Sequence, residues 1–120
     1  MLAKIVTYID YDGNERIETF RFNLTQAELT EMELSSSGGF SKHIEKIIAE
    51  KDNLRIIGLF KELILKAYGV KSDDGKRFMK SPELREAFAE TEAYSILFME
   101  LATNSDAAAA FVNGIIPQMK

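Results

Sequence analysis

Two stretches near the N-terminus alternate apolar and polar positions in the way that strands do. Residues 3–9 are rich in β-branched and aromatic side chains, and residues 17–24 alternate with a period of two. Residues 10–15 between them hold a glycine among short polar residues, which predicts a hairpin turn and antiparallel pairing. Helices are expected to cover the apolar face of the hairpin, which carries Ile17, Phe20 or Phe22, and Leu24.

The remainder of the chain repeats apolar residues at steps of three and four, the period of amphipathic helices. Thr25 and Glu28 predict a capping box that begins a short helix. Further helices are predicted from residue 41, over 53–68, over 82–102 and over 107–112. The predicted fold class is therefore α+β, mainly α, with an N-terminal antiparallel β-hairpin packed on a bundle of about five helices.

The residues between the two central helices have the composition of a turn. Gly69 is predicted to end the first helix in the left-handed conformation, and residues 72–75 predict a type I turn with Gly75 at positive φ. Ser81 and Pro82 predict the N-cap and first residue of the next helix. The pattern indicates a helix, a tight polar loop and a second helix.

The densest apolar faces lie on these two central helices and supply the predicted core. Burial of the Phe98 ring is expected to contribute about 3–5 kcal/mol to the free energy of unfolding. The predicted core residues are Phe60, Leu63, Ile64, Tyr68, Phe78, Phe88, Tyr94, Phe98 and Leu101.

A chain of 120 residues predicts one domain. We divide it into a hairpin over 1–24, a helical body over 25–114 and a short C-terminal tail over 115–120. Residues 35–39 predict a hinge or loop within the domain, because they are serine and glycine only.

The C-terminal tail carries an apolar patch that so short a segment cannot easily bury, which makes it a candidate partner-binding surface. The alternative is that Phe111 packs back onto the core and only the last residues fray. The residues of this C-terminal patch are Phe111, Ile115, Ile116 and Met119.

Charge and composition limit the classes of partner that we expect for this chain. The formal net charge is −4, so we expect neither nucleic acid nor an anionic membrane surface as a partner. There is no cysteine, which excludes disulfides and thiolate metal sites, and no run of about 18 apolar residues that could span a membrane. We expect the protein to remain in the compartment where it is made.

The sequence contains few residues in arrangements typical of a metal site or a catalytic site. Asp10, Asp12 and Asn14 match three positions of a calcium loop, but Glu15 stands where that loop requires glycine, so a hairpin turn is the favoured interpretation. His43 is the only histidine and is expected on the surface. No nucleophile elbow, phosphate-binding loop or dinucleotide motif is present. We predict no metal, no cofactor and no enzymatic activity.

Basic residues cluster around the central loop beside Phe78, as in some single-strand-binding surfaces. Acidic residues lie among them in the sequence and largely cancel the field, which favours a solvated loop of mixed charge. The basic residues are Lys71, Lys76, Arg77 and Lys80, and the acidic ones are Asp73, Asp74, Glu83 and Glu86.

The second half of the chain resembles the tail assembly chaperones of bacteriophages with long, non-contractile tails. The resemblance lies in the order and spacing of short pieces over about half of the chain, and none of them is a catalytic signature. The pieces are residues 67–70, 74–78, 88–94, 101–103 and 111–117.

The resemblance implies a non-catalytic protein that coats the long apolar tape-measure protein, keeps it soluble and assists tail-tube polymerisation. It implies many copies on that partner, a location in the host cytoplasm and absence from the virion. It also implies a longer frameshifted form that recruits the tail-tube protein in many members. Two alternatives remain open: a structural tail or connector protein retained in the virion, and a small inhibitor or adaptor that binds a host protein.

Overall fold

The computed structural model describes residues 1–35 and 53–116 of the chain. Three sequence predictions fall on other residues. The helix expected from residue 41 with its His43, all but the first residue of the loop expected over 35–39, and the position of Met119 lie outside the described residues.

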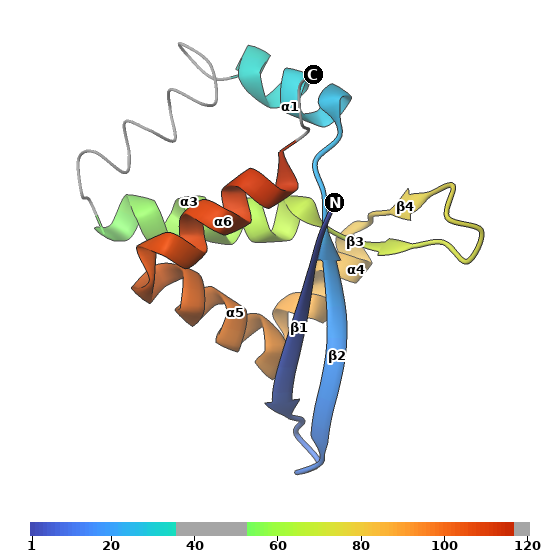
Figure 1. Ribbon diagram of the computed structural model, residues 1–120, viewed down its shortest axis with the longest axis vertical. Coiled ribbons are helices and arrows are strands. Elements are labelled where there is room, and N and C mark those ends of the chain that lie inside the picture. Colours follow the sequence, from blue (N-terminus) through green and yellow to red (C-terminus); the bar gives the residue numbers. More distant parts are fainter. Residues whose placement is uncertain (36–52, 117–120) are drawn as a thin grey trace.

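Four strands form one antiparallel sheet in the order β1-β2-β3-β4 (Figure 1). β1 (Leu2–Ile9) and β2 (Glu15–Phe22) make the predicted hairpin, with Leu2 opposite Phe22 and Ile9 opposite Glu15. Its turn places Gly13 at φ +86°. The carboxylate of Asp10 accepts hydrogen bonds from the backbone N–H groups of Asp12 and Asn14 and from Arg16, so its oxygens are used within the turn.

A second, shorter hairpin stands where the sequence predicted only a polar loop. It consists of β3 (Tyr68–Lys71) and β4 (Phe78–Met79), and it extends the sheet because Arg21 pairs with Gly69. Gly75 has the predicted positive φ, +76°. The prediction for Gly69 is wrong: it lies in β3 without a positive φ, because the chain passes directly from helix into a strand that pairs with β2.

Five helices accompany the sheet among the described residues, which confirms the predicted α+β, mainly α, fold class. They are α1 (Gln26–Ser35), α3 (Asn53–Ala67), α4 (Pro82–Ala89), α5 (Glu92–Thr103) and α6 (Ser105–Ile115). The helix predicted over 82–102 is divided in two, because the hydroxyl of Thr91 accepts from the Tyr94 N–H and begins a new helix.

Local capping explains where the helices begin. Thr25 and Glu28 form the predicted capping box, in which each side chain accepts from the backbone N–H of the other residue. Ser81 and Asn104 cap α4 and α6 in the same way through a side-chain oxygen. Each cap satisfies an N–H group that the first helical turn leaves without a partner.

The ends of α3 and α6 depend instead on the segment that follows β2. The Asn23 N–H donates to the Ala67 carbonyl at 2.8 Å, and the Leu24 N–H donates to the Ile115 carbonyl at 2.9 Å. These bonds join two helix ends to one short segment and satisfy carbonyls that have no partner within the helix. α6 includes Ile115, so this helix ends one residue beyond the predicted end of the helical body at residue 114.

The core lies between the sheet and the helices. Phe22 is fully buried at its centre, with ring centroids 5.9 Å from Tyr68, 5.8 Å from Phe88 and 5.3 Å from Phe111. Tyr68 and Phe88 stack at 4.2 Å. Phe22 therefore joins the sheet to α4 and α6 through aromatic contacts.

The predicted core residues divide into two groups. Phe60, Leu63, Ile64, Phe88 and Leu101 are buried, whereas Tyr68, Phe78, Tyr94 and Phe98 are half-buried. The expected burial of Ile17 beneath helices is wrong. Residues on a strand alternate between faces, so Ile17 lies opposite to Phe20 and Phe22 and its side chain is 67% exposed.

Candidate partner-binding cleft

The predicted C-terminal patch is not exposed as expected. Phe111 and Ile115 are only 2% and 1% exposed, and Ile116 is half-buried. The reason is that α6 continues to Ile115 and packs on β1, where Gly114 approaches Leu2 so closely that an added Cβ would lie 3.0 Å from Leu2 Cδ1. The alternative interpretation, in which Phe111 packs onto the core, describes the structure.

A cleft of about 720 Å³ lies instead where α1, α3 and α4 meet. It is lined by side chains from these three helices and from the segment that follows β2. The lining residues are Leu24, Glu28, Glu31, Met32, Glu62, Leu65, Lys66 and Arg85.

The cleft combines an apolar base with charged walls. Leu24 and Met32 are buried and Leu65 is half-buried, so they form the apolar part. On α1 the charged lining residues are both acidic, Glu28 and Glu31. On the opposite side α3 and α4 contribute Glu62, Lys66 and Arg85, of which Glu62 and Lys66 are 3.9 Å apart as an i,i+4 pair.

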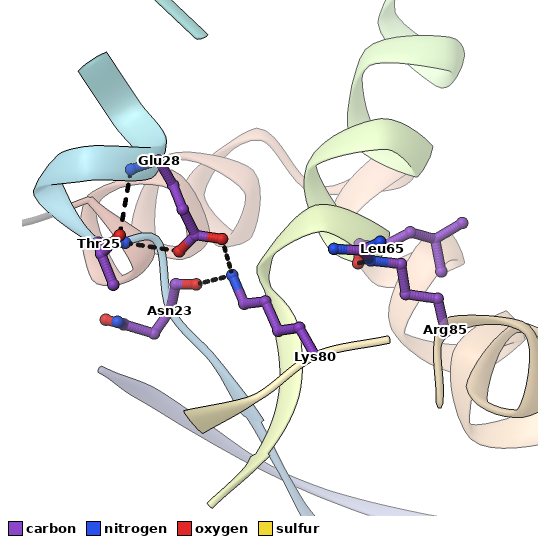
Figure 2. A network of polar contacts seen from close by, with 6 residues as sticks. All are labelled: Asn23, Thr25, Glu28, Leu65, Lys80 and Arg85. Atoms are coloured by element: carbon purple, nitrogen blue, oxygen red, sulfur yellow. Dashed lines mark hydrogen bonds and ion pairs between the residues drawn. The ribbon is translucent and has the colours of Figure 1, made fainter. Parts of the chain in front are cut away.

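Lys80 fixes the acidic wall in place (Figure 2). Its Nζ donates to the Glu28 carboxylate and to the Asn23 carbonyl, both at 2.7 Å, from a position 52 residues away from Glu28 in the chain. Glu28 at the same time serves the capping box with Thr25. One carboxylate thus connects the start of α1 to the segment before α4.

Arg85 fixes the other wall. Its guanidinium Nε donates to the Leu65 carbonyl at 3.1 Å, in the last turn of α3 (Figure 2). A cation at this end of a helix also interacts favourably with the helix dipole. The bond holds α4 against the end of α3 and directs Arg85 along the margin of the cleft.

Burial and hydrogen bonding shift the pKa values of Glu28 and Lys80. Loss of solvent lowers the pKa of Lys80, and the nearby Glu28 carboxylate only partly opposes that effect. For Glu28, loss of solvent raises the pKa, but the hydrogen bonds from Lys80 and Thr25 together outweigh it, so its pKa lies below the ordinary value of 4.5.

Two other polar clusters were singled out in the sequence, the acidic turn of the first hairpin and the basic residues around the central loop. Among the described residues no group of three or more acidic, histidine or cysteine side chains could hold a metal. Lys80 donates a hydrogen bond to Glu28 of α1, whereas Lys71, Lys76 and Arg77 are exposed on the β3–β4 hairpin. In the same part of the chain, no helix has the length and apolar character needed to cross a bilayer.

Almost the whole length of the chain matches a protein family. A family model described as phage tail assembly chaperone matches residues 1–119. This chain belongs to the phage tail assembly chaperone family. No curated protein and no solved structure matches it. The family supports a general role as a chaperone of phage tail assembly, which is a non-enzymatic role.

Sequence reasoning did not find the cleft of this chaperone. Its lining residues are far apart in the chain and belong to three helices whose mutual packing has no local signal. The capping box identified one lining residue, Glu28. One of its carboxylate oxygens accepts from Thr25, which leaves the second oxygen available for a distant cation, Lys80.

Proposed function

We propose that this chaperone binds helical segments of the tape-measure protein in the cleft between α1, α3 and α4, keeps that partner soluble and assists tail-tube polymerisation without catalysis. The observation that supports the proposal is the form of the cleft: an apolar base of Leu24, Met32 and Leu65 between charged walls. Amphipathic helices are commonly recognised by grooves of this kind.

The charges favour a particular type of helix. The α1 wall is acidic, and the α3–α4 wall carries two basic side chains and one acidic one. A helix with apolar residues on one face, basic residues along one margin and acidic residues along the other would complement both walls. Its apolar residues would insert into a cleft whose base includes a flexible methionine, which accommodates variation in detail.

The proposal includes the setting in which the chaperone acts. We place it in the host cytoplasm during assembly, in several copies along the tape-measure protein, with the tail-tube protein recruited by a longer frameshifted form. Mass spectrometry of purified particles tests this part: the chain should be absent from virions, whereas a structural tail or connector protein would be present in stoichiometric amounts.

Co-expression with the tape-measure protein tests the cleft. Leu65→Gln places a polar side chain in the base of the cleft, and it should reduce the soluble fraction of the partner at least severalfold. The matched control is Leu29→Gln, because Leu29 is also half-buried against the core but does not line the cleft. Circular dichroism of both variants should show the parental helix content.

A charge reversal gives a second comparison that perturbs packing less. Glu31 is exposed on the α1 wall, so Glu31→Lys should weaken binding of a basic margin, while Glu90→Lys outside the cleft should not. If both cleft variants solubilise the tape-measure protein as well as their controls do, the cleft is not its binding site.

A further inference from the structure

The face of the β1–β2 hairpin that points away from the helices is apolar. Its isoleucines are largely exposed, at 71% for Ile5, 67% for Ile17 and 53% for Ile9. The pairing of Thr7 with Ile17 places Ile5 and Ile9 diagonally on either side of Ile17, so the three form one patch. An antiparallel sheet covered on one face normally presents polar side chains on the other.

Within the β1–β2 hairpin, the charges on this outer face lie on β2, at its two ends, and the exposed Lys71 of the neighbouring strand β3 lies on the same face of the sheet. The β1 positions on the face, Ala3, Ile5, Thr7 and Ile9, are uncharged. Those on β2 run from Glu15 through Ile17 and Thr19 to Arg21. Within the described part of the chain, neither Glu15 nor Arg21 has an ion-pair partner.

We propose that this outer face is an interface between two copies of the chain, stacked sheet on sheet with their β2 strands antiparallel. A two-fold axis that crosses β2 midway between Ile17 and Thr19 would place Arg21 of each copy opposite Glu15 of the other. It would also bring Ile5 and Ile17 of both copies together at the centre of the interface. The inference stands independently of what the cleft binds.

The row of side chains on β2 supports a second copy as the occupant. An isologous interface requires a surface that is its own complement after a two-fold rotation. Along β2 this face carries Glu15, Ile17, Thr19 and Arg21 in that order. When two β2 strands are antiparallel, each Glu15 lies opposite an Arg21, which meets this requirement. When they are parallel, like charges lie opposite each other at both ends. The helices lie on the other side of the hairpin and do not obstruct this face (Figure 1).

The small patch predicts weak association. Stable interfaces bury roughly 800 Å² on each partner, more than three isoleucines and their neighbours supply. Pairing would thus become extensive when copies are held near one another, because tethering raises the effective concentration. Under this proposal, the hairpin supplies contacts between neighbouring copies.

Sedimentation equilibrium over a range of concentrations tests the interface. The parent chain should show a reversible monomer–dimer equilibrium, and Ile17→Lys should weaken it by at least about tenfold. The matched control is Ile96→Lys, because Ile96 is a partly exposed isoleucine on α5, which packs on the opposite face of β1. Circular dichroism should show both variants folded, since both side chains are exposed.

Charge exchange tests the antiparallel orientation. Glu15→Arg alone and Arg21→Glu alone should each weaken the dimer, and an equimolar mixture of these two variants should associate more tightly than either one by itself. The double variant Glu15→Arg, Arg21→Glu should recover the parental association constant to within about threefold. A parent chain that stays monomeric up to about 1 mM overturns the proposal. So does a dimer that responds equally to Ile17→Lys and Ile96→Lys, or one indifferent to the charge exchange.

Discussion

Two glycines of the β3–β4 hairpin are required for different physical reasons. Gly75 has φ +76°, a conformation that side chains with a Cβ rarely adopt, while no atom would contact an added Cβ there. At Gly69 the backbone is ordinary, but an added Cβ would lie 2.6 Å from Phe78 Cε2 and 2.9 Å from the Met79 carbonyl oxygen. The first residue is constrained by its own backbone and the second by its neighbours.

Alanine substitutions separate the two causes. Gly69→Ala should lower the free energy of unfolding by more than 1 kcal/mol, because β4 must move, and Gly75→Ala by about 1 kcal/mol from backbone strain. Gly58→Ala is the control, since Gly58 lies in α3 with open space around it and should stabilise the protein by about 0.5–1 kcal/mol. Urea unfolding measures all three, and an unchanged midpoint for Gly69→Ala would contradict the packing at β4.

The Glu28–Lys80 pair should be worth more than a surface ion pair. The Lys80 side chain is only 12% exposed and donates to two acceptors, so Lys80→Met should lower the free energy of unfolding by about 1–3 kcal/mol. A double-mutant cycle with Glu28→Gln isolates the interaction. Additive effects of the two substitutions would show that the pair is not coupled.

The same pair predicts a pH dependence. The folded pKa of Glu28 is depressed, so its contribution to stability is present above pH 4.5 and is lost as the pH falls through the folded pKa. The difference in unfolding free energy between the parent chain and Glu28→Gln should therefore shrink between pH 7 and about pH 3. A difference that is constant over this range would contradict the depressed pKa.

Among the secondary-structure elements, α6 differs most from expectation. Phe111 and Ile115 belong to the core, so polar substitution of Ile115 should unfold the chain and cannot serve as a test of a binding surface. Phe111→Ala should cost about 3–5 kcal/mol, whereas Phe98→Ala should cost less because the Phe98 ring is only half-buried. Thermal unfolding of the two variants ranks them, and the reverse order would contradict the assigned burial.

Helix starts could be predicted from the sequence because capping is local. Thr25 with Glu28, and Ser81 with Pro82, act within three residues of each other, and both predictions are confirmed. The ends of α3 and α6 could not be predicted from the sequence, because their last carbonyls accept hydrogen bonds from Asn23 and Leu24, which are far away in the chain. Strand β3 was missed for the same reason, since its pairing with β2 is a contact between distant segments.

At the scale of the whole molecule, the sequence predicted the fold class and the family better than it predicted which surfaces are exposed. The fold class and the family follow from periodicity and from the order of motifs along the chain. The cleft requires α1, α3 and α4 to meet, and the isoleucine patch requires the correct assignment of strand faces. Neither arrangement has a signal within a single segment, and the apolar C-terminal residues therefore suggested a binding surface that the fold buries.

The most direct test of the central claim is hydrogen exchange of the chaperone with and without a soluble helical fragment of the tape-measure protein. The proposed cleft predicts slower exchange in α1, in the C-terminal half of α3 and in α4, with little change in β1 and β2 at concentrations where the chaperone alone is monomeric. Leu65→Gln should abolish that protection, and Leu29→Gln should retain it. Binding that leaves α1, α3 and α4 unprotected and protects other elements would contradict the assignment of the cleft as the tape-measure site.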